Sequence, residues 1–392
     1  MSKIRINKFQ TGKVGLVALS HFVNDNYQAF VPLLLPLLIK KHNMTMFMSG
    51  MIVFVMRFPS ILNPIIGVYA DRMRLSSFVI VSPIITALSI SLIVLMPNYA
   101  LVITLLTISG ISSAFFHVPG PVLIRSYAGN KTAPGMSFFM FGGELARSTG
   151  PMIMLWVLAI WGLEGSWKMF FPGAVIMIVI GFFIKDNAVK ANVHNGRKRD
   201  MLFSTFKRLK KVYIIIAGLI FAKSFVLVAL TYFLPIYMTN KGVTLFLAGA
   251  SLSLLELFGA AGAFFSGPIS DIIGRKKLLI ILFSSAPVLM FAFIFSSGWI
   301  TVPLLILLGL IIFSEMPIFL AIVQDMEPEF HASANSIYMT INFVISSLVV
   351  FFIGWLGDVM DLQTVYIVCA GLALIGIPIV LPLPKDKKIQ MD

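Results

Sequence analysis

Four ionisable residues that lie inside apolar stretches are the first chemically distinctive feature of this sequence. His21 and Asp25 are four residues apart in one stretch, so on a helix they share a face and can form a hydrogen-bonded pair. Such a pair can be structural, a proton site, or both. His117 and Glu315 lie in two further apolar stretches, and His117 also fits a satisfied interior histidine. We predict that Asp25 and Glu315, with His117 and His21, exchange protons.

Three basic residues lie outside all the polar loops and suggest a second kind of chemistry. Arg57, Arg147 and Lys223 offer cationic contacts to an anionic group such as a phosphonate or a carboxylate. Structural alternatives stay open, because Glu144 and Arg147 are three apart on one helix face and can neutralise each other. A structural ion pair with a neighbour is equally open for Arg57. The candidate substrate-binding residues are Arg57, Lys223, Arg147, Glu144, Glu256 and Asn24.

The cost of charge in lipid dictates where these side chains must lie. A charge at the centre of a bilayer costs at least ~2.5–3.5 kcal/mol on insertion scales. Three basic and four acidic residues at membrane depth would not persist facing acyl chains. They must face the interior of a helix bundle or pair with one another.

The elements that carry them are predicted to be transmembrane helices. The chain has 392 residues, is 58% hydrophobic and 12% charged, and has a mean hydropathy of +0.96. A helix of about 20 apolar residues crosses a bilayer, and the sequence contains twelve such stretches. We place them at 13–39, 46–70, 76–96, 99–124, 133–158, 164–184, 212–239, 244–270, 277–297, 300–324, 331–356 and 361–382.

The distribution of basic residues predicts the orientation of these helices. If the first helix starts in the cytoplasm, the inward segments hold 23 Lys and Arg and the outward loops hold 4. The positive-inside rule then puts both termini in the cytoplasm and predicts a multi-pass protein of the plasma (inner) membrane. The net charge of +14 therefore reflects topology and affinity for anionic lipid headgroups, not nucleic-acid binding.

Two similar turns indicate that the chain is a duplicated unit. The turn Gly67–Arg74 is repeated about 200 residues later as Gly267–Lys277, and Pro36 matches Pro235 at an offset of 199. Six helices in each repeat make the repeats parallel. We predict an N-terminal bundle at 1–184, a basic cytoplasmic linker at 185–211, and a C-terminal bundle with a short tail at 212–392.

These features resemble the major facilitator superfamily and, more narrowly, its fosmidomycin resistance branch. The residues that carry the likeness, besides the two turns, are His21, Asn24, Asp25, Asn63–Gly67, Phe116–His117, Gly142–Gly143, Gly150–Pro151, Ser224 and Phe233–Pro235. The sequence departs from that branch at Val118, Glu144, Ala146 and Arg147.

The resemblance implies roles for the turns and for the cavity. It implies that the first, fourth, seventh and tenth helices line a central cavity, and each of these carries at least one titratable group here. It also implies gating latches on the inner side, Asp71 with Arg72 and Asp271 with Arg275. The glycines near 142 and 150 partly resemble an antiporter pattern, although close helix packing explains them equally well.

The function predicted is secondary active transport, most simply proton-coupled efflux (antiport) of a small, anionic organic compound or drug by alternating access. An uptake symporter for an organic anion is the alternative, followed by a membrane sensor or an intramembrane enzyme. We find no nucleophile with a base, no phosphate-binding Gly-Lys loop and no metal or haem spacing, so we expect no catalytic residue, cofactor or metal. Cys369 is predicted to be a buried packing residue. The expected partners are the solute, protons and membrane lipid, and the chain is expected to act as a monomer.

Overall fold

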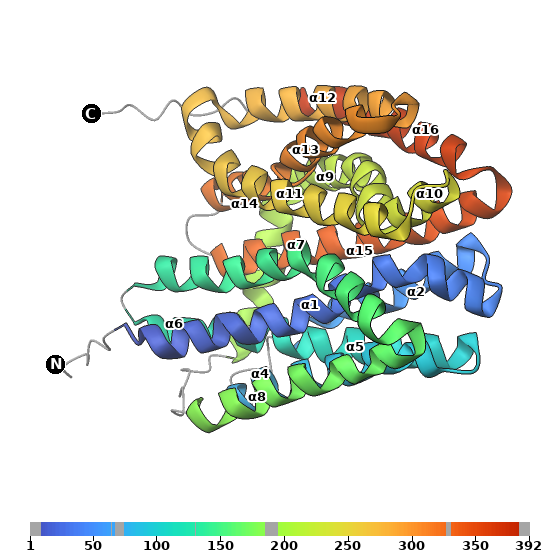
Figure 1. Cartoon of the computed structure of the whole chain (residues 1–392). Helices are drawn as coiled ribbons and strands as arrows, with labels where there is room; N and C mark the ends of the chain where they lie inside the picture. The colour runs from blue at the N-terminus through green and yellow to red at the C-terminus, as the bar shows by residue number, and fades with distance from the viewer. Residues whose placement is uncertain are drawn as a thin grey trace. The chain divides into compact units, whose positions relative to one another are not determined.

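The computed structural model describes residues 9–63, 65–66, 74–129, 131–184, 195–326 and 331–383 (Figure 1). Every regular element within these ranges is a helix. The first half contains α1 (Thr11–His42), α2 (Met46–Arg57), η1 (Phe58–Leu62), α4 (Leu75–Leu92), η2 (Ile93–Leu95), α5 (Tyr99–His117), α6 (Pro119–Ala128), α7 (Thr132–Gly165), η3 (Ser166–Met169) and α8 (Phe170–Phe183). The second half contains α9 (Asn195–Tyr232), α10 (Leu234–Asn240), α11 (Leu245–Ile273), α12 (Arg275–Phe295), η4 (Gly298–Ile300), α13 (Thr301–Ile312), α14 (Glu315–Met326), α15 (His331–Val359), α16 (Leu362–Ala373) and α17 (Gly376–Val380).

The helices have the length and composition of membrane spans. Nine helical stretches of the described chain are long and apolar enough to cross a bilayer, and Met46–Leu62 is a shorter apolar helix. One of the nine, Pro134–Phe183, has 50 residues. At 1.5 Å per residue that is about 75 Å, enough for two spans. Each of the twelve predicted stretches is helical over most of its described residues. The all-α integral membrane fold is therefore confirmed.

The contacts divide the chain into two compact units. One comprises residues 1–44 and 51–193, and the other comprises residues 45–50 and 194–392. Residues 185–194 of the predicted linker lie outside the described residues, whereas α9 begins at Asn195 and continues to Tyr232 without a break at 211. The basic residues at 195–211 predicted a polar linker, and they lie within α9 because Lys and Arg are also good helix formers. The seventh span therefore extends a helix that starts well before it.

The two repeats also match in their contacts. A Cβ at Gly110 of α5 would lie 2.4 Å from the Met56 carbonyl oxygen, and one at Gly309 of α13 would lie 2.4 Å from the Leu255 carbonyl oxygen. Both residues of the second pair follow those of the first by 199 positions. Such backbone-to-backbone contacts require glycine, so each repeat packs its second and fourth spans through the same closely spaced pair.

The fourth and tenth spans are interrupted at matching places. The helix α5 ends at His117 before Pro119 opens α6, and α13 ends at Ile312 before Glu315 opens α14 with Pro317 close behind. Proline has no N–H for the helical ladder and clashes with the preceding turn. The interruptions place His117 and Glu315 at helix ends, where the regular hydrogen-bond ladder is incomplete.

Glycines bring α1 and α7 into close contact within the first unit. A Cβ at Gly142 would lie 2.3 Å from the Ala18 carbonyl oxygen, and one at Gly150 would lie 2.6 Å from the Ala29 Cβ. Between them, a Cβ at Gly143 would lie 2.6 Å from the His21 ring. The packing interpretation of this glycine-rich stretch is therefore confirmed, and the stretch also places α7 directly on His21.

Candidate functional site

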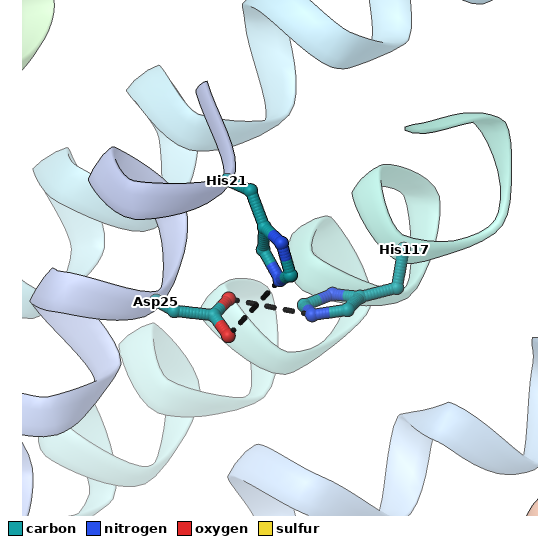
Figure 2. Close-up of side chains that lie close together, drawn as sticks. All are labelled: His21, Asp25 and His117. Atoms are coloured by element: carbon teal, nitrogen blue, oxygen red, sulfur yellow. Dashed lines mark ion pairs between the residues drawn. The ribbon is translucent and has the colours of Figure 1, made fainter. Parts of the chain in front are cut away.

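Asp25 lies between two histidines in the first unit (Figure 2). One carboxylate oxygen, Oδ2, is 3.2 Å from His21 Nε2, and the other, Oδ1, is 3.3 Å from His117 Nε2. The predicted His21–Asp25 pair, one helical turn apart on α1, is confirmed, and α5 adds the second imidazole. The His21 side chain is 5% exposed, Asp25 is 14% exposed and His117 is 34% exposed. The cluster is thus sheltered at His21 and open at His117.

The second nitrogen of each imidazole fixes its tautomer. His21 Nδ1 is 2.7 Å from the Phe139 carbonyl oxygen, and His117 Nδ1 is 2.9 Å from the Ser113 carbonyl oxygen. A carbonyl oxygen only accepts hydrogen bonds, so His21 Nδ1 carries a hydrogen and donates. His117 Nδ1 donates to the Ser113 carbonyl in the matching tautomer, and the Ser113 hydroxyl lies 3.1 Å from the same nitrogen. The His21 ring also stacks on the Phe139 ring at 4.0 Å between centroids. Both Nε2 atoms are therefore held pointing at Asp25.

This arrangement creates two places for a proton. With both imidazoles neutral, two Nε2 lone pairs face two carboxylate oxygens, all of them acceptors. A proton on either Nε2 converts that contact into a charge-assisted hydrogen bond. The cluster can therefore take up one or two protons with little rearrangement of its heavy atoms.

A polar network holds the carboxylate and the second histidine in place. Asn24 Nδ2 donates to Asp25 Oδ1 at 2.9 Å and to Ser113 Oγ at 3.3 Å, while Thr86 donates to Asn24 Oδ1 at 3.2 Å. Gln28 donates to Ser113 Oγ at 2.6 Å. Asn24, predicted to contact substrate, is fully buried and holds Asp25 here. Sequence reasoning missed the other members of this network; Ser113, four residues before His117, is the one that helical spacing indicates.

The second unit contains a related pair with the charges exchanged. Lys223 Nζ on α9 is 3.9 Å from Glu315 Oε2, and their side chains are 5% and 1% exposed. Lys223 also lies over the Phe319 ring at 5.5 Å. Lys223 follows Asp25 by 198 residues, and Glu315 follows His117 by the same 198. In each repeat one acid and one base thus join the first and fourth spans. The acid lies on the first span in the first repeat, as Asp25, and on the fourth span in the second repeat, as Glu315.

The surroundings of the Lys223–Glu315 pair are apolar. A cavity of about 10 Å³ borders both side chains, and Phe283, Pro287 and Ile312 contribute to its wall. Glu315 Oε2 accepts no hydrogen bond from the described residues. Such a space holds about one water molecule, so in this conformation the pair is not open to a larger solute.

The other predicted substrate residues take different positions. Glu144 and Arg147 form an ion pair along α7, as their spacing predicted. Arg57 is the last residue of α2 and is half-buried, and Glu256 is buried within α11. The structure thus brings together Asp25 with both histidines and Lys223 with Glu315.

The Asp271–Arg275 ion pair of the second predicted latch is present, and a second carboxylate joins it. Arg275 Nη2 is 3.6 Å from Asp271 Oδ1, and the same guanidinium contacts Asp325 near the end of α14. Sequence reasoning missed Asp325, because its partner lies 50 residues away. Asp71 and Arg72 of the first latch lie outside the described residues.

Apolar helices long enough to cross a bilayer, with charged side chains paired between them, indicate a multi-pass membrane protein, and the match to a family of transporters defines its class. A sequence model of the Major Facilitator Superfamily matches residues 17–350, so the chain belongs to that family. The fosmidomycin resistance protein of Escherichia coli K12 is 25% identical over 371 residues, which cover 93% of this chain and 91% of that protein. The MFS-type transporter YfnC of Bacillus subtilis 168, itself uncharacterised, is 25% identical over 383 residues, which cover 96% of this chain and 93% of YfnC.

Solved structures agree with this assignment. The crystal structure of a D-xylose–proton symporter has a TM-score of 0.75 to this chain and 15% identity, covering 95% of this chain and 98% of that one. At such low identity the likeness shows the fold alone. The sequence match and the shared fold together confirm the predicted family.

Proposed function

We propose that this chain is a proton-coupled exporter (antiporter) of a small organic anion or drug that works by alternating access. The observation that carries the proposal is Asp25, held between two imidazoles whose Nδ1 atoms are both committed to carbonyl oxygens. A carboxylate in that setting needs a cation or a proton beside it. Proton binding at Nε2 of His21 or His117 supplies one.

The proposed proton route enters the cluster from His117. His117 is its most exposed member, so it exchanges protons with water, whereas His21 lies beneath α7. Loading the cluster changes its charge from −1 with two neutral imidazoles to 0 or +1. A change of this size at membrane depth is worth several kcal/mol. That is enough to shift the equilibrium between the inward-open and outward-open states.

The proposed solute contacts are cationic. Arg57, Arg147 and Lys223 offer hydrogen-bond donors and positive charge, which suit a phosphonate or carboxylate. The efflux direction is supported by the relative that is named for fosmidomycin resistance. We further propose two six-helix domains, residues 1–184 and 212–392, in the inner membrane, with both termini in the cytoplasm and with the Asp271–Arg275 latch as a gate. In this proposal the chain acts as a monomer.

A second candidate function, uptake by proton–anion symport, is favoured by the Lys223–Glu315 pair. Protonating Glu315 would weaken its attraction to the Lys223 ammonium group and favour an added anion there. A proton and an anion would then bind together and move in the same direction. Antiport instead requires that the transporter binds the proton and the solute in turn, so that each crosses the membrane without the other.

Everted membrane vesicles separate these candidates, because their cytoplasmic face is outside. With an acid lumen, an antiporter accumulates labelled solute inside, whereas a symporter drives the solute out. Fosmidomycin is the first probe, and further anions come from a thermal-shift screen at two pH values, since a ligand stabilises the state that it binds. Accumulation that needs the acid lumen supports export. Transport that is indifferent to the pH gradient would refute proton coupling.

A further inference from the structure

The His21–Asp25–His117 cluster has the donor set of a metal site. Its two imidazole nitrogens and a carboxylate oxygen all lie within 4.8 Å of one another. We infer that this cluster binds one divalent transition-metal cation, with Zn²⁺ as the representative probe. This inference goes beyond the transport function and does not depend on it.

The spacing of the donor atoms fits such an ion. Zn²⁺ binds imidazole nitrogen and carboxylate oxygen at about 2.0–2.2 Å. Neighbouring ligand atoms around one ion are then roughly 3.0–3.5 Å apart, from the same bond lengths at octahedral or tetrahedral angles. The two observed contacts to Asp25 are 3.2 Å and 3.3 Å (Figure 2). Each imidazole thus lies at ligand spacing from one oxygen of the Asp25 carboxylate, and the three side chains need only close on a common point to enclose an ion.

The outer hydrogen bonds are those that metal-binding histidines make. A ligating imidazole typically donates its second N–H to a carbonyl or carboxylate, which fixes the ring and leaves the other lone pair for the metal. His21 donates to the Phe139 carbonyl and His117 donates to the Ser113 carbonyl. Asn24 in turn donates to the carboxylate. Both rings are therefore oriented before any ion arrives.

The chemistry of the donors selects the class of cation. Two imidazoles and one carboxylate suit Zn²⁺, Co²⁺ or Ni²⁺, whereas Mg²⁺ and Ca²⁺ prefer oxygen ligands. Three protein ligands leave at least one position on the ion for water, and His117 is the ligand through which the cluster is most exposed. The ligands come from α1 and α5, so a bound ion would link these two helices. Linear spacing gives no sign of this site, because His117 lies 92 residues after Asp25.

The test is calorimetric titration of Zn²⁺ into purified full-length protein whose affinity tag contains no histidine. We expect about one equivalent to bind to the wild type. His117→Gln and Asp25→Asn should each weaken Zn²⁺ binding by at least about tenfold, because loss of even an outer hydrogen-bond partner of a metal ligand costs about that much. His42→Gln, at the far end of α1, is the matched control for His117→Gln and should bind like the wild type.

Two further measurements keep the outcome clear. Thermal unfolding without metal checks that each variant is folded, and Co²⁺ absorption spectra of the wild type report imidazole ligation without any substitution. The inference is overturned if the wild type shows no saturable Zn²⁺ binding, or if His117→Gln and Asp25→Asn both bind with wild-type affinity. Because neither a proton gradient nor a solute is present, failure here leaves the export proposal intact.

Discussion

Replacing Gly143 with alanine should disturb the His21–Asp25–His117 cluster without substituting any of its ionisable residues. The added Cβ would lie 2.6 Å from His21 Cε1 and 2.8 Å from His21 Nε2. Carbon atoms in contact are normally about 3.5–4.0 Å apart. The imidazole must therefore move by roughly 1 Å, and Nε2 is the atom that faces Asp25 at 3.2 Å.

The ring has little freedom to move without loss. It stacks on Phe139 at 4.0 Å and donates to the Phe139 carbonyl oxygen. Overpacking a buried site costs about 1–3 kcal/mol, and losing a buried hydrogen bond costs about 0.5–1.5 kcal/mol. We expect Gly143→Ala to lower the free energy of unfolding by about 2–4 kcal/mol in total, and to reduce gradient-driven transport.

The assay compares Gly143→Ala with Gly15→Ala in thermal unfolding and in everted-vesicle transport. A Cβ at Gly15, also within a helix, meets no atom within 4 Å. Gly15→Ala should be neutral or stabilising by about 0.4–1 kcal/mol, because alanine restricts the unfolded chain. If Gly143→Ala unfolds and transports like Gly15→Ala, the proposed seating of His21 against α7 is refuted.

Three further predictions concern the remaining charges. Glu315→Gln and Lys223→Met should each destabilise the protein, and the double variant should cost less than the sum by about 1 kcal/mol or more; additive unfolding free energies would contradict the buried pair. Asp325→Asn should change the unfolding free energy by less than about 1 kcal/mol, because its carboxylate is 62% exposed, and high salt should remove the difference; a salt-independent loss would count against this ion pair. Asp361, at the start of α16, has its pKa lowered by hydrogen bonds from the Thr364 hydroxyl and backbone N–H, at 2.5 Å and 3.0 Å. The stability that this carboxylate adds is complete above its unfolded pKa and is lost as pH falls through the lower folded value, so melting temperatures of the wild type and Asp361→Ala should converge in acid.

Local spacing predicted the local parts of the site. The pairs His21–Asp25 and Glu144–Arg147 follow from helical periodicity alone, and both are present. The spans followed from hydropathy, because a bilayer imposes one length on every crossing helix.

The long-range parts needed the structure. His117 reaches Asp25 from another helix, and both histidines are fixed by backbone carbonyls that no side-chain pattern reveals. The repeat offset of 199 placed Asp25 one residue from the counterpart of Lys223. In the structure the ion pairs Asp25–His117 and Lys223–Glu315 are related by 198 residues, whereas Pro36 and Pro235 are related by 199. The helix break at Phe233 lies between Lys223 and Pro235. A one-residue slip of this kind is invisible without coordinates.

The central claim is that the proton which drives transport binds at Asp25 and its two histidines. The most direct measurement is solute accumulation by Asp25→Asn in everted vesicles with an acid lumen, beside solute exchange in the same vesicles without a gradient. We predict that Asp25→Asn still exchanges solute across the membrane but no longer accumulates it. Uphill accumulation by Asp25→Asn at the wild-type level would contradict the assignment.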